Sequence, residues 1–172
     1  EDLPRLIASL QEQSITDWKF FIYENSCDQT EYDRVEKTLK ESGIPYELYT
    51  GPENTGFAGG HNILFSKHEA EFILLLNDDS YLEAGYLEAV LSRFESDPNC
   101  AAVAGPVYRW TSKGTGKETL KEETRIDTLG LEYHSLAEIG DIGSGDTYYK
   151  WHDWVKTPHR LFGVSGAVSV FR

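Results

Sequence analysis

The sequence Phe-Ile-Leu-Leu-Leu-Asn-Asp-Asp-Ser at positions 72–80 decides the fold. Its five consecutive apolar residues show no polar alternation, which is typical of a strand buried on both faces, as in a parallel sheet covered by helices. Asn77, Asp78 and Asp79 follow at once and are therefore expected at the carboxyl end of that strand. Ligands of open α/β sheets bind beyond the carboxyl ends of the strands, so this junction is the first candidate site.

Helix and strand patterns alternate on both sides of this segment. Apolar spacing and turn residues predict helices at 3–10, at 30–42 with a Thr30–Asp33 capping box and a stop at Gly43, at 61–68 and at 86–94. Short apolar runs predict strands at 18–23, 46–50, 72–76 and 101–104. This order predicts an α/β fold, a Rossmann-like sandwich with a mainly parallel central sheet.

The pattern changes after residue 108. Residues 109–150 are rich in Gly, Thr, Lys and Glu and contain one strand-like stretch, 129–134, so we expect a long irregular insertion there. A last apolar stretch, 161–171, reads as a strand that carries Gly163 and Gly166.

The composition is that of an acidic globular protein. The 172 residues are 40% hydrophobic, enough for one core, so residues 1–172 are expected to form a single domain. The net charge of -13 argues against nucleic-acid binding, because a phosphate backbone is held by dense Lys and Arg. No apolar run is long enough to cross a bilayer, and two cysteines without metal-ligand spacing favour a reducing, cytoplasmic setting.

Asn77, Asp78 and Asp79 are also the sharpest chemical signal. Two carboxylates and a carboxamide offer the oxygen ligands that a hard divalent cation prefers, and such a cation can bridge a diphosphate. Mg²⁺ or Mn²⁺ is the expected cofactor, a Lewis acid for the nucleoside diphosphate that leaves when its bond to a sugar breaks. The alternative is that Asp79 or Ser80 only caps the following helix, and from these residues alone both interpretations stand.

Two further loops carry polar residues suited to a nucleotide. Residues 54–62, Asn-Thr-Gly-Phe-Ala-Gly-Gly-His-Asn, place glycines and asparagines at a helix start, where backbone N–H groups favour phosphate or ribose oxygens. Glu24, Asn25 and Asp28 follow the strand at 18–23 and can hydrogen-bond a base edge or a ribose hydroxyl. Taken alone, an ordinary helix start and an Asx-type turn are the simpler explanations.

In this order, the three loops resemble those of glycosyltransferase family 2, the inverting enzymes with the GT-A fold, and especially its rhamnosyltransferase-like members. The similar segments are 24–28, 54–62 and 74–79, with Gly-Val-Ser-Gly-Ala at 163–167 similar to a later strand that lines the acceptor side. The resemblance implies the GT-A fold of nucleotide-diphospho-sugar transferases. Its specificity lies in the ordered combination, since each segment is weak in isolation.

Carried over position by position, the resemblance implies a set of residues that bind the nucleotide-sugar: Glu24, Asn25, Asp28, Asn54, Gly56, Asn62, Asn77 and Asp78. The first loop would contact base or ribose, the second would shape the nucleotide pocket, and the strand end would place ribose and diphosphate. Asp79 would be the principal metal ligand. Three departures weaken the match: Glu24 replaces the usual Asp, the loop 24–28 is one residue short, and Asn77 replaces the first Asp of Asp-x-Asp.

The expected function is metal-dependent transfer of a hexose or deoxyhexose from a UDP- or dTDP-sugar to a hydroxyl of a glycan or lipid-linked acceptor, with inversion, in polysaccharide biosynthesis. The expected location is the cytoplasm, with peripheral association at the inner face of the membrane left open. Two alternatives remain. One is a non-catalytic nucleotide- or glycan-binding module. The other is a sugar-nucleotide pyrophosphorylase, but this sequence lacks the Gly-rich segment with Lys or Arg that such enzymes carry near their start.

Two parts of the family pattern are missing from residues 1–172. Family members have an apolar strand before the first helix and an acidic general base beyond the Gly-Ala strand, usually in a Glu-Asp pair. Inversion needs such a carboxylate to take the proton of the acceptor hydroxyl. We therefore name no catalytic residue, and expect a fragment whose own activity is open; the absence of methionine also fits a trimmed chain.

Overall fold

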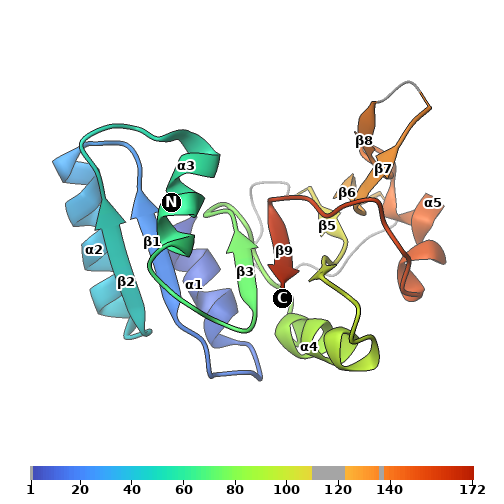
Figure 1. Ribbon diagram of the computed structural model, residues 1–172, viewed down its shortest axis with the longest axis horizontal. Helices are drawn as coiled ribbons and strands as arrows, with labels where there is room; N and C mark the ends of the chain where they lie inside the picture. The colour runs from blue at the N-terminus through green and yellow to red at the C-terminus, as the bar shows by residue number, and fades with distance from the viewer. Residues whose placement is uncertain (1, 110–122, 136–137) are drawn as a thin grey trace. The chain divides into compact units, whose positions relative to one another are not determined.

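The computed structural model describes residues 2–109, 123–135 and 138–172 (Figure 1). The chain divides into two compact units. Unit 1 comprises Glu1–Glu71 and Tyr81–Glu88, and unit 2 comprises Phe72–Ser80 and Ala89–Arg172.

Unit 1 is built around two parallel strands. Along the chain it contains α1 (Leu3–Gln11), β1 (Phe20–Glu24), α2 (Gln29–Ser42), β2 (Tyr46–Thr50) and α3 (Gly56–Phe65). Strands β1 and β2 pair from Phe20↔Tyr46 to Glu24↔Thr50, so both strands end at the same edge. The loops that follow β1 and β2 therefore leave the sheet side by side.

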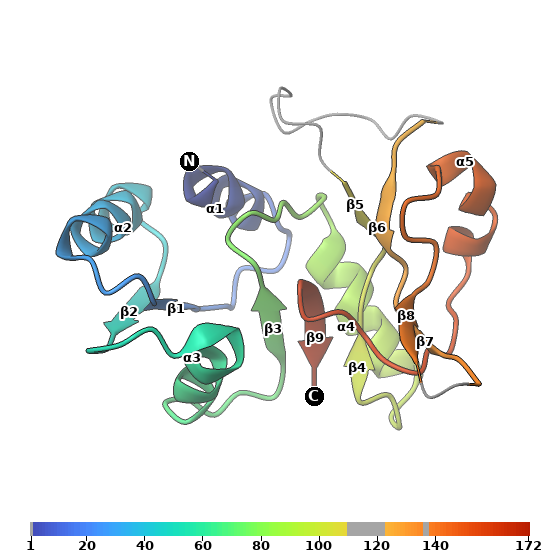
Figure 2. The same ribbon diagram turned by 90° about the horizontal axis from the view of Figure 1, so that it is seen from above.

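Helices cover both faces of this strand pair (Figure 2). On one face, Ile7 of α1 and Leu39 of α2 are buried together with Ile44, and alternate residues of β1 and β2 pack against them. On the other face, α3 lies against β1, where its buried residue Gly60 meets the ring of Tyr23. Successive side chains of a strand point to opposite faces of the sheet, so β1 and β2 pack against α1 and α2 on one face, and β1 packs against α3 on the other.

A buried polar anchor joins α1 to the segment 81–88 of the same unit. Ser9, with 0% exposure, accepts a hydrogen bond of 3.1 Å from Leu82 N through its Oγ. Gln13, with 4% exposure, accepts one from Leu87 N and donates another to the carbonyl of Glu83. These side chains satisfy backbone groups that would otherwise be buried without partners.

The ends of α2 and α3 differ from the prediction. The Thr30–Asp33 capping box is wrong, because α2 begins at Gln29 and is capped by Asp28, whose Oδ1 accepts from Thr30 N at 2.8 Å. The predicted stop is confirmed, since Gly43 adopts φ +69°. Helix α3 begins at Gly56, before the predicted residue 61, so the glycine-rich segment is mostly helical.

Unit 2 contains short strands and short helices. They are β3 (Ile73–Leu76), β4 (Ala102–Val103), β5 (Val107–Tyr108), β6 (Ile126–Thr128), β7 (Leu131–Tyr133), β8 (Ile139–Asp141), α5 (Tyr148–Trp151), a 3-10 turn (Trp154–Lys156) and β9 (Val168–Phe171), together with most of α4 (Tyr86–Ser96). Strand β9 lies between β3 and β4 and is antiparallel to both. The pairs β5–β6 and β7–β8 are also antiparallel.

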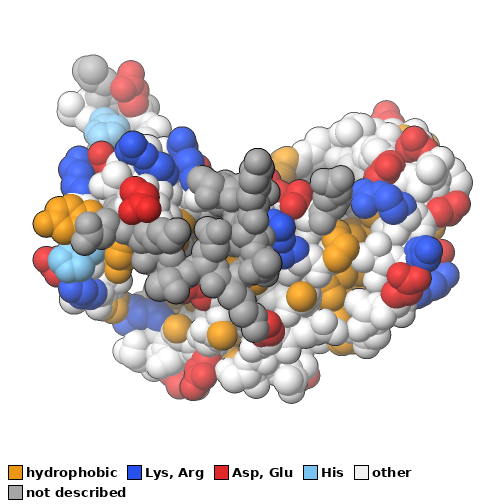
Figure 3. All heavy atoms as spheres, turned by 180° about the vertical axis from the view of Figure 1, so that it is seen from behind, with side chains coloured by type: hydrophobic (Ala, Val, Ile, Leu, Met, Phe, Trp, Pro, Cys, Tyr) orange, Lys and Arg blue, Asp and Glu red, His pale blue; other side chains and the backbone are white. Residues whose placement is uncertain are grey.

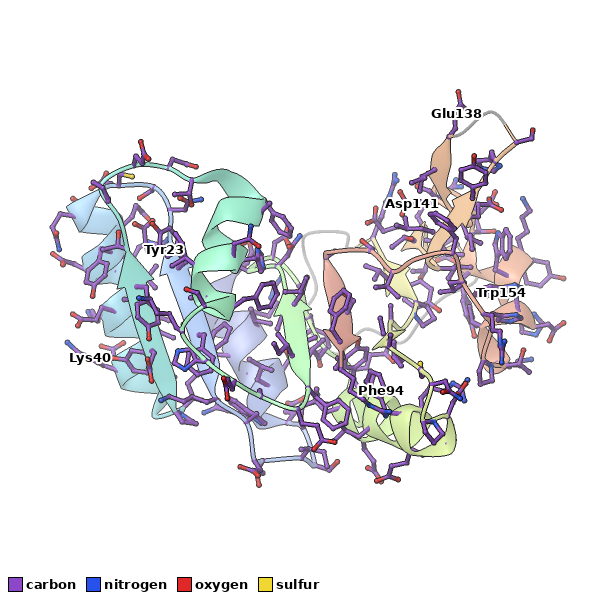
Figure 4. All side chains as sticks on the ribbon, in the orientation of Figure 1. Tyr23, Lys40, Phe94, Glu138, Asp141 and Trp154 are labelled. Carbon is purple, nitrogen blue, oxygen red and sulfur yellow. The ribbon has the colours of Figure 1, made fainter. Side chains whose placement is uncertain are left out.

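The unit 2 core lies around β9 and α4. Val168 and Val170 are buried on β9, and Phe94 of α4 has 1% exposure. The ring centroids of Phe94 and Phe72 are 5.0 Å apart. The guanidinium carbon of Arg172 lies over the Phe94 ring, 4.7 Å from its centroid. Figure 4 shows Phe94 on the helix beside the end of β9.

The expected α/β content is present, but the mainly parallel central sheet is not. Among the described strands only β1 and β2 pair directly in parallel, and β3, which we expected in a parallel sheet, pairs with the antiparallel β9. A continuous apolar run indicates burial on both faces and carries no information on strand direction, which explains the error. The predicted strand at 161–171 is confined to Val168–Phe171.

The segment predicted as an irregular insertion, 109–150, contains β6, β7, β8 and α5 in its described part. Its remaining residues, 110–122 and 136–137, lie outside the described chain.

Candidate functional site

The end of β3 is held in a defined turn. Asn77 N donates a hydrogen bond of 2.9 Å to the carbonyl of Ala167, and Ser80 N donates one of 3.2 Å back to the carbonyl of Asn77. Asp78 and Asp79 occupy the two central positions of this turn, and both are exposed. Helix α4 begins only at Tyr86, so neither Asp79 nor Ser80 caps it, and the helix-cap alternative is wrong.

The two carboxylates are available to a ligand. In the described part of the chain, neither Asp78 nor Asp79 makes a side-chain hydrogen bond or an ion pair. Exposed oxygen donors on a fixed turn suit a hard cation such as Mg²⁺, which keeps several waters and binds one or two carboxylates together with substrate phosphates. Within residues 2–109, 123–135 and 138–172, no three His, Cys, Asp or Glu side chains cluster as a metal cage. Phosphate and water would have to complete any coordination sphere here.

Asn25 links the loop after β1 to the start of α3. Its Oδ1 accepts hydrogen bonds from Thr55 N at 2.8 Å and Thr55 Oγ1 at 3.3 Å, and its Nδ2 donates to the carbonyl of Gly56 at 3.1 Å. The two loops that sequence analysis assigned to the nucleotide are therefore in direct contact within unit 1. In this conformation, the amide of Asn25 acts as a clamp between them.

Glu24 and Asp28 shape the rest of the first loop. Glu24 Oε1 accepts from Ser26 N at 2.8 Å, while its Oε2 is buried without a hydrogen-bond partner among the described residues. Such an oxygen is costly unless a ligand or water donates to it. Asp28 serves as the N-cap of α2, and Cys27 between them takes φ +63°, so the loop turns sharply.

The second loop closes in an Asx turn. Asn54 Oδ1 accepts a hydrogen bond of 2.8 Å from Gly56 N, and Gly56 itself adopts φ +70° at the first position of α3. No atom lies within 4 Å of a Cβ built on Gly56, so there is open space beside the start of the helix. Asn62 lies about one and two-thirds turns further along α3 and is exposed.

Sequence analysis did not identify Tyr23 as a residue that shapes the site. A Cβ built on Gly51 would lie 2.2 Å from the Tyr23 hydroxyl oxygen, and one built on Gly60 would lie 3.3 Å from its ring. Tyr23 therefore fills the space between β2's end and α3 (Figure 4). A glycine directly after a strand, such as Gly51, was the available signal for this close approach.

The aromatic residues near α5 are packed against one another. The Trp154 ring stacks on His159 at 3.8 Å, and Trp151 Nε1 donates to Asp146 Oδ2 at 2.8 Å. Hydrogen bonds from Lys150 and then Trp151 hold the pKa of Asp146 below its usual value. These tryptophans thus fill a small satellite core.

The surface charge is mixed. On the face shown in Figure 3, Lys and Arg side chains are interspersed with Asp and Glu. A nucleic-acid surface would gather cations along one face. In the described part of the chain, no helix has both the length and the apolar character required to cross a membrane.

Comparison with protein-family models gives a match over most of the chain. The model of Glycosyl transferase family 2 matches residues 1–149, which include β1, α3, the 77–80 turn and the described strands up to β8. Comparison with curated proteins found no match.

Proposed function

We propose, from the premise that the chain belongs to glycosyl transferase family 2, that it moves a hexose or deoxyhexose from a UDP- or dTDP-sugar to a hydroxyl of a glycan or lipid-linked acceptor. Family membership makes it a glycosyltransferase with the GT-A fold, a nucleotide-sugar donor and a glycan acceptor. The donor type, inversion and metal dependence are our proposal. Both cysteines, Cys27 and Cys100, are free, which fits a cytoplasmic location.

The observation that carries the proposal is the pair of free carboxylates at the end of β3. Asp78 and Asp79 face solvent from a turn whose two ends are fixed by backbone hydrogen bonds. We assign Asp79 as the principal ligand of Mg²⁺ or Mn²⁺, with Asn77 and Asp78 beside the ribose and diphosphate. When bound, the cation would supply positive charge to the departing diphosphate.

The loops of unit 1 would hold the nucleotide. The buried Oε2 of Glu24 would accept a hydrogen bond from the base or ribose, because the described residues give it no donor. The first turn of α3 after Gly56 would offer backbone N–H groups to anionic or polar oxygens, since the N–H of Gly56 itself already donates to Asn54. Asn62 adds an exposed amide, whereas Asn25 keeps the two loops together and Asn54 and Asp28 fix their turns.

In the proposed reaction, the acceptor oxygen attacks the anomeric carbon from the face opposite the diphosphate. The new C–O bond forms as the bond from that carbon to the diphosphate oxygen breaks, and a base takes the acceptor proton. The chain carries many carboxylates, but we assign none of them as this base.

Isothermal titration of UDP and dTDP, each with and without Mn²⁺, tests the donor and metal assignments. We expect binding of one nucleotide to strengthen when Mn²⁺ is present, because the cation would bridge carboxylate and diphosphate. Asp17→Asn is a suitable control, since Asp17 is an exposed aspartate that precedes β1, at the opposite end of that strand from Glu24. Binding of neither nucleotide to the folded chain would refute the proposal.

A non-catalytic binding module is the second candidate. Asn77 in place of an aspartate favours it, because one fewer carboxylate is available at the turn. Slow hydrolysis of the donor sugar in Mn²⁺ would support a transferase, whereas tight nucleotide binding without any hydrolysis would support the module. Family membership favours transfer over the pyrophosphorylase interpretation.

A further inference from the structure

Unit 2 exposes three large apolar side chains that form one patch on the β7–β8 hairpin. Tyr133 and Ile139 are directly opposite each other across the hairpin, and the rings of Tyr133 and Phe162 are 5.5 Å apart. Their exposed fractions are 56%, 58% and 62% for Tyr133, Ile139 and Phe162. Exposed aromatic groups in contact with one another are a recognised mark of an interaction site.

The patch is tied to the turn that follows β3. Phe162 N donates to the carbonyl of Leu131 on β7 at 3.2 Å, which fixes Phe162 beside the hairpin. Five residues later, the carbonyl of Ala167 accepts the hydrogen bond from Asn77 N. A chain of five residues spans at most about 18 Å, so the Phe162 backbone lies within about that distance of Ala167, the residue bonded to Asn77, inside one unit.

Polar groups border the patch. Asp141 lies two residues from Ile139 on β8 and so shares its face of the hairpin, and Glu138 precedes Ile139; both carboxylates are exposed (Figure 4). Neither makes a side-chain hydrogen bond or an ion pair in the described part of the chain. Carboxylates accept hydrogen bonds from hydroxyl groups, whereas they repel an anionic lipid surface.

We propose that the patch of Tyr133, Ile139 and Phe162 binds a saccharide ring of the acceptor glycan. This inference rests on the proposed function, which requires an acceptor near the donor diphosphate. The C–H face of a sugar ring packs on exposed aromatic faces, while its hydroxyl groups reach the Asp141 and Glu138 carboxylates. Three side chains are too few for a stable contact with a second copy, which needs about 20–30 residues a side.

A glycan array tests the assignment, with the full chain applied in the presence of UDP and Mn²⁺. Tyr133→Ala and Phe162→Ala are the test variants, and Tyr133→Phe keeps the ring. Tyr149→Ala is the matched control, because Tyr149 is a 65% exposed aromatic residue of the same unit that lies outside the patch and stacks on His152. Circular dichroism and sedimentation velocity of each variant check the fold and the oligomeric state.

We expect both alanine variants to bind the recognised glycans about three- to tenfold more weakly, the scale of one stacking contact, and Tyr133→Phe and Tyr149→Ala to bind as the wild type does. UDP affinity should be the same in all four variants. If the wild type bound neither UDP nor dTDP, the proposed function would be refuted. Three outcomes with intact UDP binding would refute the glycan-binding inference and leave the proposed function standing. They are that the wild type binds no glycan, that the alanine variants bind glycans normally, or that the alanine substitutions only dissociate a dimer.

Discussion

The backbone N–H of Asn77 and the carbonyl of Ala167 form a 2.9 Å hydrogen bond that extends the β3–β9 ladder by one residue. The ladder ends there, and Asp78 and Asp79 are the first residues beyond it. A segment from the far end of the chain thus fixes the backbone from which both carboxylates project. The 163–167 and 77–80 segments, which resemble separate parts of one family pattern, are neighbours in unit 2.

Asp79→Asn should weaken Mn²⁺-dependent UDP binding by about tenfold or more, because an amide oxygen is a poorer ligand than a carboxylate for a hard cation. Asp78→Asn should have a smaller effect, since we assign Asp78 beside the ribose and diphosphate. Titration calorimetry with and without Mn²⁺ separates the two. Equal affinity of wild type and Asp79→Asn for UDP at limiting Mn²⁺ would remove Asp79 from the metal site.

Asn25→Ala should lower the free energy of unfolding by about 1–3 kcal/mol, because three hydrogen bonds that join two loops are lost. Asn62→Ala should leave stability unchanged and weaken only UDP binding, since its exposed side chain makes no hydrogen bond in the described chain. Urea denaturation and calorimetry of both variants give the comparison. If Asn25→Ala kept full stability, the clamp would have no energetic role.

The sequence predicts features that depend on neighbouring residues better than those that depend on distant ones. Strand 46–50 and the Gly43 helix stop are confirmed, because a short strand-forming run and a left-handed glycine are local signals. The clamp by Asn25 could not be predicted, since its partner Thr55 lies 30 residues away. The antiparallel pairing of β3 with β9 was equally inaccessible, because it joins segments that are close only in the folded chain.

In the candidate site, too, the features set by neighbouring residues were predicted and those set by distant residues were not. The sequence singled out Asp78 and Asp79 as carboxylates directly after a strand, and the structure places them there, exposed in a turn. The sequence allowed Asp79 to be either a metal ligand or the cap of the next helix. The helix-cap interpretation was excluded only by the structure, in which α4 begins at Tyr86. Metal binding and the contacts of Glu24, Asn54 and Asn62 with a nucleotide remain predictions.

Asp146→Asn should destabilise the protein more at pH 7 than at pH 3. The hydrogen bond from Lys150 and then that from Trp151 lower the folded-state pKa of Asp146 below its ordinary value of 3.8. The resulting stability is present above the unfolded pKa and is lost as the pH falls through the folded pKa. Denaturation of both proteins at several pH values checks this: a difference that stayed constant down to pH 2 would show that ionisation of Asp146 contributes nothing.

Gly51→Ala should destabilise unit 1 by about 1–3 kcal/mol, because the new methyl group would overlap the Tyr23 hydroxyl. The built Cβ lies 2.2 Å from that oxygen but 3.4 Å from the ring carbon Cζ. Tyr23→Phe removes the oxygen alone, so Gly51→Ala in that background should have little effect. A double-mutant cycle by urea denaturation measures this coupling. Additive effects of the two substitutions would mean that the Tyr23 ring moves aside easily and does not position the loop after β2.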